Sequence, residues 1–292
     1  MQQFRWYPIY VVYSKARQEF MEQQIDRYAA GNDPGIFDWA QNVGRNSESI
    51  RPDKESPESR HYETTILNLL NKIESNKVGG LLLESLAPGS KIYIHPLTER
   101  TRHSDCYKCT GLTTWWEMTL KQGGGRRIAF SPELVKSDQT DDVLVHELMH
   151  AYRGESKMRA RRGIGLQYPD GEEFIAHYIE NMYRSAKGRA DLEFSYYRHY
   201  AHASQFGTKS SIYHHIVENE REIFAFRFFL DSDPLCANLA KKSWPAFNPF
   251  RDFQILHRLS LNSKLTGEYP MTMEQVREFW PSFFTAVGPN DY

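Results

Sequence analysis

Residues 140–154 read Thr-Asp-Asp-Val-Leu-Val-His-Glu-Leu-Met-His-Ala-Tyr-Arg-Gly, and this stretch decides the fold class. Thr140 is suited to cap the start of a helix, and Gly154 is suited to end it. Acidic residues at the next two positions favour the positive end of the helix dipole. The pattern therefore predicts a helix over 141–153. One face of it carries apolar side chains for burial, namely Leu144, Val145, Leu148, Met149 and Tyr152.

His146, Glu147 and His150 form an H-E-x-x-H pattern on this helix. Residues four apart share one helix face, so both imidazoles can reach a single ion. Zinc accepts His nitrogens at about 2.0–2.1 Å, and two rings on adjacent turns supply half of a tetrahedral site. Glu147 can take a proton from the attacking water and pass it to a leaving amine. The competing interpretation is an amphipathic helix whose His and Glu face solvent, but burying these groups without a metal is costly.

A third zinc ligand is needed, and residues 170–181 (DGEEFIAHYIEN) supply candidates. A second helix over 172–187 begins here with acidic residues in its first turn. Glu173 and Glu172 both qualify as the ligand, which would give one zinc per chain. The competing interpretation is a capping-box-like pair of Asp170 and Glu173 that needs no metal. His177 lies one turn later and either orients a ligand or is a core histidine.

Three segments together resemble a known group: VLVHELMHAYRG, YPDGEEFIAHYIENMYRSAKGR and WPAFNPFR. They are similar to the zinc metallopeptidase domains of bacterial secreted effectors and polymorphic toxins, including type III effector zinc proteases that cleave host signalling kinases. The resemblance covers roughly residues 80–255. The segment after Glu172 also resembles the third-ligand segment of anthrax lethal factor, which implies that Glu173 is the ligand. The resemblance further implies that Tyr168 stabilises a tetrahedral intermediate, because a phenol can donate to a developing oxyanion; a packed loop tyrosine is the alternative.

The resemblance implies a zincin-like fold and a zinc-dependent peptidase that acts on a protein or peptide substrate. The strand expected over 126–130 could pair with an extended substrate. One alternative is a peptidoglycan-peptide hydrolase with the same site, and another is a non-catalytic zinc-containing binding module. Glu147 argues against the binding module, which does not need a general base. A cognate immunity protein or a secretion chaperone is the implied type of partner.

The composition is that of a globular protein: 292 residues, 40% hydrophobic, 14% aromatic and a formal net charge of −1. This charge argues against nucleic-acid binding by net field, and no apolar run is long enough for a membrane span. Three cysteines cannot form a full disulfide framework. The first residues lack the pattern of a cleaved signal peptide. We therefore expect synthesis in a reducing cytoplasm. The resemblance implies that this cytoplasm is bacterial and that the protein is secreted or translocated without signal cleavage.

The pattern of elements predicts an α+β fold, mostly helical, with a small sheet. We expect a single domain over 1–292, with an N-terminal strand, helix and flexible loop (1–60), a catalytic core (61–256) and a C-terminal helical extension (257–292). The expected strands are 4–13, 91–95 and 126–130. The expected helices are 14–30, 66–83 with a break at Gly79–Gly80, 141–153, 172–187, 217–229 and 273–286. A polar loop is expected over 43–60, and an irregular segment over 245–249.

Three further clusters carry weaker signals. His103, Cys106 and Cys109 could form a second metal site or a redox pair. His199 and His202 lie in an aromatic stretch, 194–202, that reads either as substrate contacts or as a buried aromatic helix. A third cluster contains residues of the types that bind metals, but we expect its acids on a solvent-exposed helix face. Its members are His214, His215, Glu218, Glu220 and Glu222.

Overall fold

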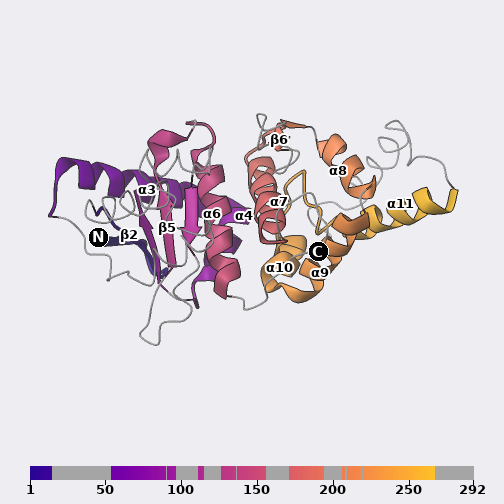
Figure 1. The fold of residues 1–292 in the computed structure, drawn as a ribbon, viewed down its shortest axis with the longest axis horizontal. Helices are drawn as coiled ribbons and strands as arrows, with labels where there is room; N and C mark the ends of the chain where they lie inside the picture. The colour runs from indigo at the N-terminus through magenta and orange to yellow at the C-terminus, as the bar shows by residue number, and fades with distance from the viewer. Residues whose placement is uncertain are drawn as a thin grey trace, which may run out of the picture.

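The computed structural model describes residues 1–14, 54–89, 91–96, 111–114, 126–135, 137–155, 171–193, 206–207, 209–218 and 220–266. Helices dominate these residues, and a small mixed sheet accompanies them, so the expected mostly helical α+β class is confirmed. Figure 1 shows strands β2 and β5 on the left with helix α3, and helices α7 to α11 on the right together with strand β6. Among the described helices, none has the length and apolar character that crossing a membrane requires.

The main sheet has five strands in the order β1 (Gln2–Gln3), β2 (Ile9–Val11), β3 (Ile92–His95), β5 (Arg126–Phe130) and β4 (Gly111–Thr114). The three central strands run parallel, whereas β1 and β4 pair antiparallel at the two edges. The strands expected over 91–95 and 126–130 are confirmed. β4 was not predicted. A second sheet pairs β6 (Leu192–Glu193) with β7 (Phe206–Gly207).

The single strand expected over 4–13 is wrong. A turn interrupts it, in which the amide of Tyr7 donates to the carbonyl of Phe4, and the chain folds into a β1–β2 hairpin. Arg5 occupies this turn with a φ of 48°. Phe4 and Tyr7 are both buried although residues three apart point to opposite faces of a strand, which agrees with the turn and not with one continuous strand.

Two helices follow, α3 (Pro57–Ser75) and α4 (Lys77–Leu86). The break between them is at Asn76 and not at Gly79–Gly80, as was expected. The side chain of Asn76 accepts from the amides of Val78 and Gly79 and so starts a new helix. Gly79 is needed because an added Cβ would lie 2.2 Å from the carbonyl oxygen of Ile73. The expected loop over 43–60 is wrong at its end, since Ser56 caps α3.

The two helices that carry the candidate site are α6 (Thr140–Glu155) and α7 (Gly171–Ala186), and they pack against each other. Both were predicted within two residues. α6 also contacts β4 and β5, so it joins the sheet to α7. The hydroxyl of Thr140 lies 3.4 Å from the carbonyl oxygen of Ser137, and the helix continues past Gly154.

Four helices complete the described chain: α8 (Lys209–Glu218), α9 (Glu220–Ser232), α10 (Pro234–Lys242) and α11 (Phe253–Thr266). The single helix expected over 217–229 is therefore wrong, because two helices share that range. The irregular segment over 245–249 is confirmed. The expected helix over 273–286 lies outside the described residues, and so does the one over 14–30 apart from Ser14.

Candidate metal centre

α6 is buried on nearly every side, which fixes the direction of its polar residues. The five apolar residues predicted to face the core are at most 9% exposed. His146, Glu147 and His150 are also buried, at 8%, 7% and 7% exposed. The competing interpretation, a helix whose His and Glu face solvent, is thereby excluded. Three ionisable groups at this depth require partners, because an unpaired polar group loses its hydration without compensation.

α7 presents Glu173 to this cluster because the next residue anchors the helix on the opposite side. Phe174 is fully buried, and its ring lies 4.8 Å from the ring of Tyr178 and 5.0 Å from that of Phe226. Neighbouring helix positions differ by about 100° in direction. Burial of Phe174 against α9 therefore leaves Glu173 facing α6.

Three ligand atoms converge between the two helices. Nε2 of His146 lies 3.0 Å from Nε2 of His150. The Glu173 carboxylate approaches both rings, with Oε2 at 3.3 Å from His146 and Oε1 at 3.2 Å from His150. One ligand atom from each residue lies within 4.8 Å of those of the other two. This is the cluster that the sequence predicted, and it can hold a metal ion.

The spacing of these atoms fits a tetrahedral ion. Ligand atoms at about 2.0–2.2 Å from one zinc ion are roughly 3.3–3.5 Å apart in tetrahedral geometry. The two Nε2 atoms are 3.0 Å apart, and each lies 3.2–3.3 Å from one of the two Glu173 oxygens, which is close to this value. Two imidazoles and one carboxylate are the donor set of catalytic rather than structural zinc sites, which use more cysteine. The Glu173 side chain is 24% exposed, although its Oε2, the oxygen next to His146, is buried.

Glu180 orients the first histidine. Its Oε2 lies 3.1 Å from Nδ1 of His146, on the opposite side of the ring from the ligand atom. A proton on Nδ1 leaves the Nε2 lone pair available for a metal. The sequence analysis missed this residue. Its signal is the row of polar residues that share one face of a buried helix, namely Glu173, His177, Glu180 and Arg184.

His177 was one candidate for this orienting role. Its Nε2 lies instead 3.2 Å from the side-chain nitrogen of Asn181, one turn along α7. The residue is 1% exposed. Of the two interpretations, the core histidine is the one that these contacts favour.

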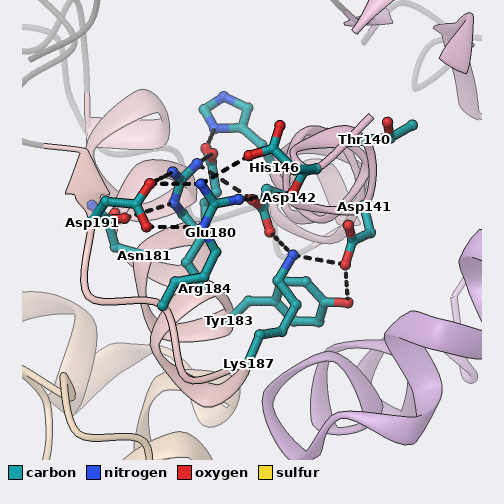
Figure 2. A network of polar contacts seen from close by, with 12 residues as sticks. Thr140, Asp141, Asp142, His146, Glu180, Asn181, Tyr183, Arg184, Lys187 and Asp191 are labelled. Atoms are coloured by element: carbon teal, nitrogen blue, oxygen red, sulfur yellow. Dashed lines mark hydrogen bonds and ion pairs between the residues drawn. The ribbon is translucent and has the colours of Figure 1, made fainter. Parts of the chain in front are cut away.

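A network of charged residues lies behind Glu180 (Figure 2). Arg184 is buried and places its guanidinium 3.7 Å from Glu180 and 3.3 Å from Asp142, in the first turn of α6. Lys187 approaches Asp142 to 2.5 Å and Asp141 to 2.9 Å. The network joins the start of α6 to the end of α7, so it holds the two site helices in a fixed register.

The electrostatics of the cluster favour protonated histidines and an ionised carboxylate when no metal is bound. Burial lowers the pKa of His146, but hydrogen bonds to Glu173 and Glu180 outweigh it and leave the pKa well above the ordinary value. Burial likewise lowers the pKa of His150, and the charge of Glu173 more than offsets this. Burial raises the pKa of Glu173, but the two histidines bring it well below its usual range. A metal at this site must therefore displace protons.

Glu147 lies beside the cluster and is not one of the three converging ligands. Its charge contributes to raising the pKa of His150, which places the carboxylate near that ring. A buried carboxylate whose charge acts on a candidate ligand, but which is outside the ligand set, is the type of group that serves as a general base.

Several predicted residues lie outside the described part of the chain. These are Tyr168, His103, Cys106, Cys109, His199 and His202, together with the side chain of Glu172. Their roles stay predictions. Of the two candidate third ligands, the structure describes the side chain of Glu173 alone. Glu173 reaches both histidines.

Glu222 was expected on a solvent-exposed helix face, and the structure places it in the core. Glu222 is 0% exposed, so its expected place on a solvated face is wrong. The hydroxyl of Tyr178 donates to its Oε2 at 2.6 Å, and Nε2 of His215 lies 3.1 Å from its Oε1. The acid thus ties α7, α8 and α9 together inside the core. Phe224 and Phe228, on the same helix, are 61% and 42% exposed.

The strand that was expected to pair with an extended substrate, 126–130, has no unpaired edge in the described sheet. Residues 126–130 form β5, whose two neighbours β3 and β4 occupy both of its edges. β4 (Gly111–Thr114) is the outer strand on this side of the described sheet, and it contacts α6.

No protein-family model, curated protein or solved structure matches this chain.

Proposed function

We propose that this protein is a zinc-dependent peptidase whose metal is held by His146, His150 and Glu173. The observation that carries the proposal is the convergence of these three side chains to 3.0–3.3 Å, with buried Glu147 beside them. A structural site would close the coordination sphere with a fourth protein ligand. Among the described residues three ligands converge, which supports a site that keeps a coordination position for water or substrate.

Each residue has a separate task in this proposal. Zinc supplies Lewis acidity, which polarises a scissile carbonyl and lowers the pKa of water. Glu147 takes the proton from the attacking water and passes it to the leaving amine. Glu180 keeps the proton of His146 on Nδ1, so that Nε2 stays a ligand.

The sheet supplies a place for an extended substrate. We propose β4 in place of β5, because β4 has an unpaired edge among the described strands and contacts the helix that carries the histidines. An extended peptide can add to such an edge through main-chain hydrogen bonds. A zincin-like fold and delivery as a bacterial effector or toxin are proposals that rest on the motif resemblance.

The test compares wild type with Glu147→Gln. Gln is nearly isosteric and cannot accept the proton, so turnover should fall by about 10²–10⁴-fold while zinc content stays unchanged. Casein and purified peptidoglycan sacculi serve as alternative substrates, and they separate the peptidase from the peptidoglycan-peptide hydrolase. A Glu147→Gln variant as active as wild type would exclude the mechanism. Stoichiometric zinc without turnover on either substrate would favour the non-catalytic binding module.

A further inference from the structure

A second feature of the molecule is an open pocket of about 1170 Å³ that contains none of the candidate metal ligands. Its wall comes from the α3–α4 junction, the end of α7 and the segment after α10. The volume is sufficient for a small ligand. The charged and aromatic residues that line it are Lys72, Lys77, Lys187, Arg189, Asp138, Tyr183 and Trp244.

The pocket presents cations, whereas most of the neighbouring carboxylates lie beneath its surface. Asp141 and Asp142 are both 0% exposed. Asp141 contacts Lys72 and Lys187 at 2.9 Å, and Asp142 contacts Lys187 and Arg189. An anion that enters the pocket therefore meets ammonium and guanidinium groups first. Asp138 is the one acidic residue among those that line it.

The lining of the pocket is positive, because four cations and one carboxylate, that of Asp138, line it. The buried carboxylates of Asp141 and Asp142 offset part of this charge from beneath the surface. Among the described residues, Lys77 has no ion-pair partner, and it is exposed. Burial raises the pKa of Asp142 to about 6, so this acid carries less than its full charge near neutral pH.

The cations approach the pocket from two directions. Lys72 and Lys77 lie on either side of the α3–α4 junction, and Lys187 and Arg189 lie at the end of α7. Several donors that converge from different elements match a tetrahedral anion with oxygens on all sides better than they match a single carboxylate. Trp244 is 52% exposed and forms part of a further wall.

We propose that this pocket binds the phosphate group of a ligand, at a site separate from the candidate metal centre. Lys77 supplies the charge that no protein carboxylate neutralises, and Lys72, Lys187 and Arg189 complete the cationic wall. The proposal is independent of peptidase activity, because none of these side chains belongs to the zinc ligand set.

Inorganic phosphate is the probe, and Trp244 is the built-in reporter. The full chain is titrated with phosphate at an ionic strength held constant with KCl, and binding is followed by tryptophan fluorescence and calorimetry. Saturable binding of one phosphate per chain is expected. Trp244→Phe should remove the fluorescence change and keep the heat of binding.

Lys77→Glu is the decisive variant and should weaken phosphate binding at least tenfold. It should fold, because an acidic residue suits the first turn of α4. Lys54→Glu makes the same charge change at the opposite end of α3, on another exposed lysine, and should bind as wild type does. If phosphate bound to zinc and not to the pocket, Lys77→Glu would bind phosphate as tightly as wild type does. That result would overturn the proposal. An identical response to added KCl alone would overturn it as well.

Discussion

Nδ1 of His146 lies 3.1 Å from Oε2 of Glu180, across the interface between α6 and α7. Both side chains are buried, at 8% and 6% exposed. The contact fixes the ring of His146 and directs its other nitrogen towards Glu173. Glu180 thus belongs to the candidate metal centre although it lies outside the H-E-x-x-H motif.

Removing this carboxylate should weaken metal binding. We expect Glu180→Ala to lower zinc affinity by about 10–100-fold, because partners of this kind hold the ligand ring and its tautomer. Glu180→Gln keeps an acceptor oxygen and should lose less. Zinc titration against a chromogenic chelator measures both. Glu84→Ala, an exposed acid on α4, is the control and should bind zinc as wild type does. Unchanged affinity in Glu180→Ala would show that His146 needs no orienting partner.

Glu173→Ala and Glu172→Ala test the third ligand. Wild type should bind about one zinc per chain. Glu173→Ala should release it, because a two-histidine site is weak and loosely defined. Glu172→Ala should change zinc affinity little, since the two positions differ by about 100° around the helix. Metal analysis and thermal melts separate loss of metal from loss of stability. Release of zinc by Glu172→Ala alone would assign the ligand to Glu172.

The metal-free protein should show a characteristic pH dependence. The folded-state pKa values of His146 and His150 are above 6.5, so their stabilising contribution is complete below pH 6.5 and is lost as the pH rises through these raised values. The pKa of Glu173 is below 4.5, so its contribution is present above pH 4.5 and is lost as the pH falls through the lowered value.

The melting temperature of metal-free wild type should therefore exceed that of metal-free Glu173→Ala most clearly between pH 4.5 and 6.5. The difference should shrink on either side of this window. Zinc affinity should rise with pH over the same range, since binding displaces the histidine protons. A melting-temperature difference that stays constant across the pH range would contradict the ion-paired state of the empty site.

The parts of the fold that depend on local sequence were predictable. α6 and α7 were anticipated because their apolar spacing, acidic first turns and buried face lie within one segment each. The convergence of His146, His150 and Glu173 followed from the motif together with a second helix. The helix break was predicted at Gly79–Gly80 because glycine usually interrupts a helix. It occurs at Asn76, and Gly79 instead permits close contact with Ile73.

The remainder depends on contacts between distant segments. Glu180 became a partner of His146 only through the rotation of α7, which burial of Phe174 sets. Glu222 was expected in solvent because its neighbours in sequence are charged, but Tyr178 and His215 come from other helices to meet it. β4 is four residues long and lacks a clear alternation, so its pairing with β5 could not be read from sequence.

Asp233 should be among the most sensitive positions for stability. Its carboxylate accepts from the hydroxyl of Tyr152 at 2.9 Å, from Arg153 at 2.6 Å and from the amide of Leu235 at 3.0 Å. It thereby caps α10 and anchors the end of α6. Both members of the ion pair with Arg153 are 0% exposed.

Asp233→Ala leaves the Arg153 charge buried without this partner and removes a helix cap. We expect a loss of about 3–5 kcal/mol in the free energy of unfolding, measured by urea denaturation. Asp231→Ala is the matched control, because its ion pair with Arg227 is more than half exposed at both ends, and it should cost less than about 1 kcal/mol. Zinc affinity should be unchanged in the fraction of Asp233→Ala that folds, since none of the three ligands contacts Asp233 directly. Equal stability of the two variants would mean that hydration reaches Arg153 and that α6 is held to α10 by apolar packing alone.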